Sequence, residues 1–201
     1  MASVGIINCG LGNLTSVQNA FLSIRQECDV IDTPSHIEDC DRLVLPGVGA
    51  FPSAMEKLQS GEFVDPICHH INAGKPFLGI CMGMQVLFET GEENGTTPGL
   101  GLLKGTVVKL PEGKQPIPNM GWWDVFGDLD QFSDALTDKD SFYFVHSYHC
   151  ALQASYSRLS IEFNNLDVTV GVRHDNILGC QFHPEKSQKS GQKILTEFLR
   201  M

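Results

Sequence analysis

Short apolar runs alternate with segments of helical periodicity through the first half of the chain. Three of the runs have the length of buried strands, and they stand at 4–8, 42–45 and 77–80. Apolar residues elsewhere recur every three or four positions, which predicts helices at 14–24, 51–59, 62–73 and from Cys81 to about Thr90. Asn13 is placed to cap the first helix, and Gly74 is placed to end the third.

The order of these elements predicts the fold class. Strands that alternate with helices form an α/β fold of flavodoxin-like type, with a mostly parallel central sheet flanked by helices. The second half has a different pattern, with strands joined by loops predicted at 106–110, 142–145, 168–173 and 177–182, and additional antiparallel strands are expected in this half. An irregular proline-rich stretch is expected at 111–118 and a last helix around 194–199. No linker or repeat interrupts residues 1–201, so we expect a single domain.

Composition and charge exclude several classes of function. The 201 residues are 42% apolar and 19% charged, as in ordinary soluble globular proteins. A net charge of −10 argues against binding nucleic acid or an anionic membrane, since both require basic surface. No apolar run approaches the roughly 20 residues of a membrane span, and the N-terminus lacks the features of a signal peptide. The seven scattered cysteines include no Cys-x-x-Cys pair, which indicates free thiols and a cytoplasmic location.

The segment Gly79-Ile80-Cys81-Met82-Gly83 is the most informative one for chemistry. It follows an apolar run and leads into helix-forming residues, which is the order of a nucleophile elbow: strand, sharp turn, reactive side chain, helix. The two glycines suit the close approach of strand and helix, because they carry no Cβ. The elbow would hold the sulfur at a helix N-terminus, where the helix dipole favours the thiolate. Such a thiolate can attack a carbonyl carbon.

A base for that thiol is offered by His183-Pro184-Glu185 near the C-terminus. His183 can take the thiol proton and later protonate a leaving group. Residues i and i+2 of an extended segment face the same side, so Glu185 would hold the imidazole in one tautomer. Each motif is weak alone, but their joint presence beside predicted strands indicates a Cys-His-Glu triad.

An acyl-transfer site also needs donors for the oxyanion that forms on the attacked carbonyl. The elbow places the backbone N–H of Met82 for this role. The loop Pro46-Gly47-Val48-Gly49 follows a neighbouring strand and offers further backbone amides. Its glycines leave the peptides free to rotate, so the loop could switch between aligned and misaligned states.

Other motifs carry less weight. Gly10-x-Gly12 has Thr15 where a dinucleotide-binding fingerprint needs its third glycine. The histidine pairs 69–70 and 146–149 lack a convergent third ligand, so surface or core histidines are the simpler interpretation. Trp122 and Trp123 stand beside the proline-rich stretch and suit either the core or a protein interface.

Taken together, these segments resemble one family over essentially the whole chain, the class I (triad) glutamine amidotransferases. More closely, the chain resembles the glutaminase subunits of imidazole glycerol phosphate synthases. The segments that carry the resemblance stand at 45–49, 79–85, 142–148 and 181–187. Their order and spacing are highly specific to this group.

The resemblance implies a role for each matching residue. The catalytic residues would be the nucleophile Cys81, the base His183 and its partner Glu185. The oxyanion donors would come from Gly47, Val48, Gly49 and Met82. Glutamine would be bound by Gln85 and Glu93 and by the backbone of His146, Ser147 and Tyr148. A partner subunit would be contacted by Asn13, Met120, Trp122 and Trp123.

The resemblance also implies a reaction. Glutamine would be hydrolysed to glutamate through a thioester, and the ammonia would pass to a separate (β/α)8-barrel cyclase of histidine biosynthesis. No metal or organic cofactor is implied.

Three positions depart from the family pattern. Met82 stands where leucine is usual, which leaves the backbone donor in place. Asn119 and Trp123 stand where histidine and asparagine are usual, in a stretch that lies near the partner in the family. They bear on the identity of the partner and leave the glutaminase chemistry untouched.

Three other functions stay open. The first is a paralogous glutaminase that feeds an amidotransferase for surface sugars. The second is a non-catalytic regulatory subunit, against which the intact triad argues. The third is a cysteine peptidase of similar fold, which the glutamine-pocket match at Gln85 disfavours.

Overall fold

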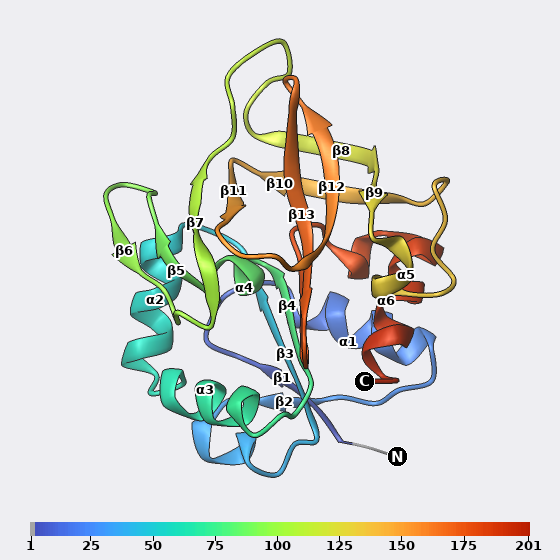
Figure 1. Ribbon diagram of the computed structural model, residues 1–201. Helices are drawn as coiled ribbons and strands as arrows, with labels where there is room; N and C mark the ends of the chain where they lie inside the picture. Colours follow the sequence, from blue (N-terminus) through green and yellow to red (C-terminus); the bar gives the residue numbers. More distant parts are fainter. Residues whose placement is uncertain (1–2) are drawn as a thin grey trace.

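Figure 1 shows the computed structural model of the chain, which describes residues 3–201. An eight-stranded sheet runs through the described part in the order β2-β1-β3-β4-β14-β13-β12-β9. Its parallel strands are β1 (Val4–Ile7), β2 (Asp29–Ile31), β3 (Arg42–Gly47), β4 (Phe77–Cys81) and β14 (Ile177–Cys180). Antiparallel pairing adds β13 (Leu166–His174), β12 (Ser157–Phe163) and β9 (Phe126–Gly127). The predicted combination of a mostly parallel sheet with antiparallel additions is confirmed.

Helices cover both faces of this sheet, as predicted. On one face lie α1 (Leu14–Ser23) and α6 (Gln188–Phe198), where the rings of Phe21 and Phe198 meet edge to face at 6.2 Å. On the other face lie α2 (Phe51–Ser60) and α3 (Val64–Asn72), which appear on the left of Figure 1. Neighbouring residues of one strand enter different cores, since successive side chains of a strand point to opposite faces. Val44 packs toward α1 and α6, whereas Leu43 packs toward α2 and α3.

The predicted helix ends are confirmed in two places. The side chain of Asn13 accepts a hydrogen bond from the backbone N–H of Ser16 at 3.2 Å and so caps α1. Gly74 follows α3 with a φ of +78°, the left-handed conformation in which many helices end.

The helix predicted from Cys81 to about Thr90 is wrong beyond its first turn. The helix α4 spans only Met82–Gln85, and the chain then forms β5 (Phe88–Gly91). β5 belongs to a second sheet with β6 (Thr97–Pro98), β7 (Leu103–Lys109) and β11 (Tyr148–Leu152). The run from Val86 to Phe88 is buried throughout, and an apolar run of that length fits a buried strand as well as a helix.

A third sheet completes the half of the molecule that holds the pocket described below. It pairs β8 (Asn119–Asp124) with β10 (Ser141–His146) in antiparallel register, and His146 lies opposite Asn119. The remaining elements are single turns at η1 (Pro34–Ile37), α5 (Leu129–Phe132) and η2 (Pro184–Lys186). No helix among residues 3–201 combines the length and the apolar character that a membrane crossing requires.

Candidate active site

Cys81 occupies a sharp turn between β4 and α4. Its backbone has φ 55° and ψ −107°, a conformation that a residue with a Cβ adopts only under strain. The glycines on both sides permit this turn. A Cβ on Gly79 would lie 2.5 Å from the carbonyl oxygen of Gly83, and a Cβ on Gly83 would collide with the carbonyl oxygen of Leu45. The strand-turn-helix geometry predicted for this segment is therefore confirmed.

His183 and Glu185 form a buried pair. Nδ1 of His183 lies 2.8 Å from Oε1 of Glu185, and their side chains are only 3% and 5% exposed. The segment is not extended as predicted. Pro184 starts the 3-10 turn η2, and the turn brings the two side chains together. Proline suits the first position of a turn because its φ is already fixed near the helical value.

Neighbouring elements hold the backbone of His183 in place. Its N–H donates to the carbonyl oxygen of Tyr143 at 3.0 Å, and its carbonyl accepts the hydroxyl of Ser187 at 2.6 Å. The ring of Phe182 is fully buried and stacks on Phe142 with centroids 4.0 Å apart. The histidine therefore sits on a rigid anchor.

The charge state of His183 suits a base that has already taken the proton of the thiol. Burial alone would lower the pKa of His183, but the neighbouring Cys81 and Glu185 side chains outweigh it and raise the pKa to about 9. The imidazolium is thus favoured at neutral pH. Nδ1 is bonded to Glu185, which leaves Nε2 to exchange a proton with the neighbouring Cys81.

A cavity of about 340 Å³ opens beside Cys81, a size that suits small molecules. Most of the residues expected to bind glutamine or the oxyanion line it: Val48, Gly49, Met82, Gln85, Glu93, His146, Ser147 and Tyr148. Pro118 and Val145 complete the wall. Gly47 lies behind this wall, where a Cβ would be 2.9 Å from the Cβ of Met82.

Glu93 brings a carboxylate to the pocket from the loop after β5. Its Oε2 accepts a hydrogen bond from the backbone N–H of Phe51 at 2.7 Å. Phe51 begins α2, whose preceding residue makes no side-chain cap of its own. The carboxylate is thus fixed by the helix N-terminus, where a negative charge is stabilised.

Gln85 is tied to a residue that sequence reasoning did not single out, Gln181. Nε2 of Gln85 lies 2.8 Å from Oε1 of Gln181, and Nε2 of Gln181 lies 3.6 Å from the sulfur of Cys81. Gln181 is fully buried. A signal was present in the sequence, because Gln181 and His183 flank the apolar Phe182, as side chains on one face of a strand do.

The comparison with known proteins decides the family. The family described as "Glutamine amidotransferase class-I" matches residues 5–201. This chain belongs to the class-I glutamine amidotransferases. The resemblance found in the sequence is thereby confirmed.

Two curated relatives of this amidotransferase are both named "Imidazole glycerol phosphate synthase subunit HisH". The protein from Desulfitobacterium hafniense is 42% identical over 97% of this chain and 92% of its own length. The protein from Lactococcus lactis subsp. lactis is 42% identical over 99% of this chain and 98% of its own length.

Solved structures support the fold alone. A "Crystal structure of glutamine amidotransferase" matches with a TM-score of 0.77 at 20% identity, covering 98% of this chain and 97% of that one. "Structure of PurLQS from Thermotoga maritima" matches with a TM-score of 0.74 at 19% identity, covering 100% and 99%.

The amidotransferase exposes apolar side chains on β8. Met120 is 63% exposed and Trp122 is 49% exposed. Trp123 points to the other side of the strand and packs on Phe163 with ring centroids 5.8 Å apart. Asn13, the fourth residue expected at the partner surface, is exposed at the start of α1. A partner role for all four residues stays a prediction.

The histidine pairs 69–70 and 146–149 of the amidotransferase were considered above as metal ligands. Within residues 3–201, no three His, Cys, Asp or Glu side chains converge as a metal site requires. His70 and His146 are buried, and burial lowers the pKa of each to about 4, so both rings are neutral at physiological pH.

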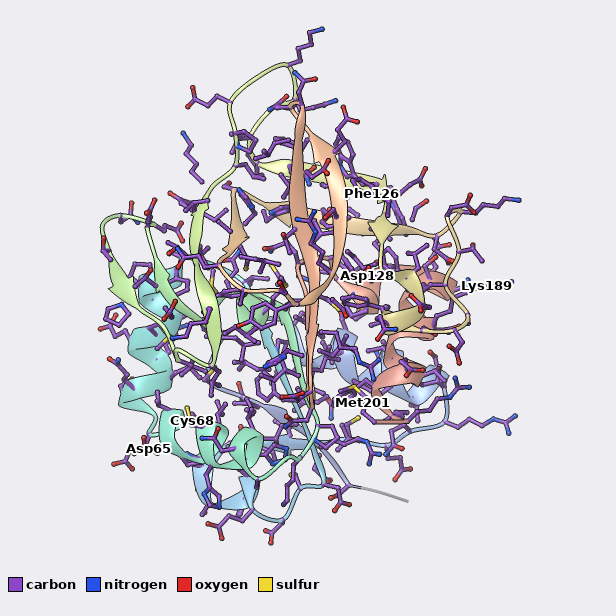
Figure 2. All side chains as sticks on the ribbon, in the orientation of Figure 1. Asp65, Cys68, Phe126, Asp128, Lys189 and Met201 are labelled. Atoms are coloured by element: carbon purple, nitrogen blue, oxygen red, sulfur yellow. The ribbon has the colours of Figure 1, made fainter. Side chains whose placement is uncertain are left out.

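We expect Cys81 to react faster than any other cysteine with an electrophilic glutamine analogue. Burial raises the pKa of the six other thiols: Cys9, Cys28, Cys40, Cys68, Cys150 and Cys180. Cys68 is the natural comparison, because it is a half-buried thiol on α3 (Figure 2), and no residue of that helix lines the pocket. Peptide mapping after brief labelling at pH 7 measures each rate. Faster modification of any other cysteine would rule out the elbow assignment.

Proposed function

We propose that the chain is the glutaminase subunit of an imidazole glycerol phosphate synthase. It hydrolyses glutamine and passes the ammonia to a cyclase subunit for histidine biosynthesis. The observation that carries the chemistry is the strained Cys81 at the pocket wall, with the buried His183–Glu185 pair beside it. The near-full-length identity of about 42% to HisH proteins supports the pathway.

The proposed reaction has two halves. The Cys81 thiolate attacks the side-chain carboxamide carbon of glutamine, and the C–N bond breaks after His183 protonates the nitrogen, so ammonia leaves. Water, deprotonated by His183, then attacks the thioester, releases glutamate and restores the thiol. In both halves a negative charge develops on the carbonyl oxygen, and backbone N–H groups of Met82 and of the loop 47–49 stabilise it.

Glutamine binding follows from the charges and donors of the pocket wall. The carboxylate of Glu93 attracts the α-ammonium group of the substrate. Both N–H bonds of the Gln85 amide are already used, toward Tyr148 and Gln181, so its carbonyl oxygen is left to accept a hydrogen bond from the substrate. Residues 146–148 line the same pocket.

The partner in this proposal is a (β/α)8-barrel cyclase that forms a heterodimer with the chain. We assign its docking surface to the exposed Met120 and Trp122, and the family resemblance adds Trp123 and Asn13. Exposed apolar side chains, aromatic ones above all, are typical of the centres of protein interfaces. All seven cysteines are unpaired, which supports a location in the reducing cytoplasm.

Complementation in a histidine auxotroph that lacks both synthase subunits tests the proposal. The chain is expressed together with the cyclase from its own organism. We expect growth without histidine, and we expect this growth to be lost on Cys81→Ala when ammonia is limiting. Failure to grow, although both proteins are soluble and associated, would refute the histidine assignment. The surface-sugar amidotransferase would then be the partner to test.

A further inference from the structure

A chain of hydrogen bonds runs along the pocket wall from β8 to the nucleophile. Nδ2 of the buried Asn119 lies 3.0 Å from Nε2 of His146, and Nδ1 of His146 lies 2.8 Å from the carbonyl oxygen of Tyr148. The same carbonyl lies 3.0 Å from Nε2 of Gln85. Gln85 bonds to Gln181, and the Gln181 amide nitrogen reaches the sulfur of Cys81 at 3.6 Å.

The direction of each bond in this chain is fixed by the Tyr148 carbonyl, which can only accept. Nδ1 of His146 must therefore carry its proton. Since burial keeps this ring neutral, Nε2 carries a lone pair, which accepts a hydrogen bond from the side-chain amide of Asn119. Gln85 must likewise turn its NH₂ group toward Tyr148.

The second N–H of Gln85 then points at Gln181 and requires an oxygen there. A flipped Gln181 would set two NH₂ groups against each other. The NH₂ group of Gln181 is consequently the end of the amide that faces the sulfur of Cys81. This group can only donate hydrogen bonds to the sulfur.

We propose that Gln181 is a catalytic residue, whose side-chain amide donates a hydrogen bond to the Cys81 sulfur and so favours the thiolate. The reaction it serves rests on the proposed function, whereas the contact does not. A hydrogen bond to an anion is roughly twice as strong as one to a neutral group, so the same N–H stabilises the thiolate more than the thiol.

Gln181 supplies what the helix after Cys81 cannot. α4 is a single turn of four residues, and it aligns far fewer peptide dipoles than the longer helix that the sequence predicts. Direct donors therefore matter more at this sulfur than in an elbow that leads into a long helix. The side-chain amide of Gln181 donates to the sulfur of Cys81, and the imidazolium of His183 is the charged group next to the same sulfur.

The position of Gln181 is held rigidly. Its backbone N–H donates to the carbonyl oxygen of Val170 at 2.9 Å, and the next residue, Phe182, is buried between Phe142 and Phe144. Burying an amide in such surroundings costs free energy unless its hydrogen bonds are made, and an apolar side chain would avoid that cost. A glutamine at this position is explained by the two bonds that it makes: its oxygen accepts from Gln85, and its nitrogen donates toward the sulfur of Cys81.

The test is the pH dependence of Cys81 alkylation by iodoacetamide in the purified chain, followed by peptide mapping from pH 5 to 10. Gln181→Met keeps the length of the side chain and removes the donor, together with the acceptor that Gln85 uses. We expect the half-maximal rate to move up by about one to two pH units, since a hydrogen bond to a charged group is worth that much. The matched control is Gln192→Met on α6, where the amide bonds to Ser23 at 3.0 Å. It should leave the profile unchanged.

An unchanged profile in Gln181→Met would overturn the inference, because a residue that only fills space alters stability and not this midpoint. If that variant fails to fold, Gln181→Glu serves in its place. Gln181→Glu keeps an acceptor for Gln85 and places a carboxylate next to the sulfur of Cys81. The pH of half-maximal alkylation should therefore rise at least as far as in Gln181→Met. An unchanged pH of half-maximal alkylation would contradict the inference.

Glutaminase activity with the cyclase bound separates this inference from the proposed function. Full activity of Gln181→Met overturns the role of Gln181 and leaves the function standing. Failed complementation by the unaltered chain overturns the function, while a shifted alkylation profile still supports the contact.

Discussion

Replacing Cys81 by alanine is expected to abolish glutamine-dependent synthesis while ammonia-dependent synthesis by the cyclase continues. The thioester cannot form without the sulfur, and loss of a nucleophile of this kind costs about 10⁴-fold or more in rate. The small methyl group leaves the strained turn and the pocket walls in place. The measurement is product formation by the reconstituted complex, first with glutamine and then with an ammonium salt as the nitrogen source.

The matched control for this experiment is Cys180→Ala. Cys180 is fully buried, and burial raises its pKa, so it is an inert thiol at neutral pH. Its loss should lower stability modestly and leave glutamine use intact. Glutamine-dependent synthesis that survives in Cys81→Ala would overturn the covalent mechanism. Loss of the ammonia-dependent reaction as well would indicate that the chain is needed as a scaffold.

The elements that could be predicted from the sequence are those with the strongest apolar patterns. β1, β3 and β4 are continuous apolar runs because both of their faces are covered by helices, and such runs are visible in one sequence. The helices α1, α2 and α3 show their inner faces as regular repeats, and Asn13 and Gly74 mark two of their ends.

The strands that sequence reasoning missed are half exposed or short. β8 alternates between buried and exposed residues, and its tryptophans stand on opposite faces, which hides it from a search for apolar runs. β5 and β11 are defined by their pairing with β7 from distant parts of the chain. Such long-range pairing cannot be read from local pattern alone.

The candidate site was only partly visible for the same reason. Motifs such as Gly-x-Cys-x-Gly and His-Pro-Glu are local, so the elbow and the His183–Glu185 pair could be expected from them. The contact between Gln85 and Gln181 joins residues 96 positions apart and depends on the register between β4 and β14. The short α4 is likewise a consequence of β5 entering another sheet, which makes the donor on Gln181 more important than the sequence suggests.

The isolated chain should be a weak glutaminase, and its rate should rise about 10²- to 10³-fold when the cyclase and its nucleotide substrate are bound. Val48 is 46% exposed and lines the pocket, so a partner can reach the loop that holds the oxyanion donors. Gly49 has a φ of +108°, and a Cβ there would meet nothing within 4 Å, so nothing packs on that side to hold the peptide. Moving one oxyanion donor into line is worth about 3–4 kcal/mol, which corresponds to the expected range.

Gly49→Ala tests whether rotation of this loop is the source of the activation. There is room for the Cβ of alanine at this position, but alanine strongly disfavours a positive φ. The loop therefore loses one of its two arrangements, aligned or misaligned with the oxyanion. We expect the ratio of partner-bound to isolated activity to fall toward one.

Gly74→Ala is the matched control. Gly74 has a φ of +78° and equally open surroundings, but it ends α3 away from the pocket. The substitution should therefore lower stability and leave the ratio unchanged. Steady-state glutamate release, measured with and without the partner, gives both ratios. Full activity of the isolated chain, or an unaltered ratio in Gly49→Ala, would show that the loop is not the gate.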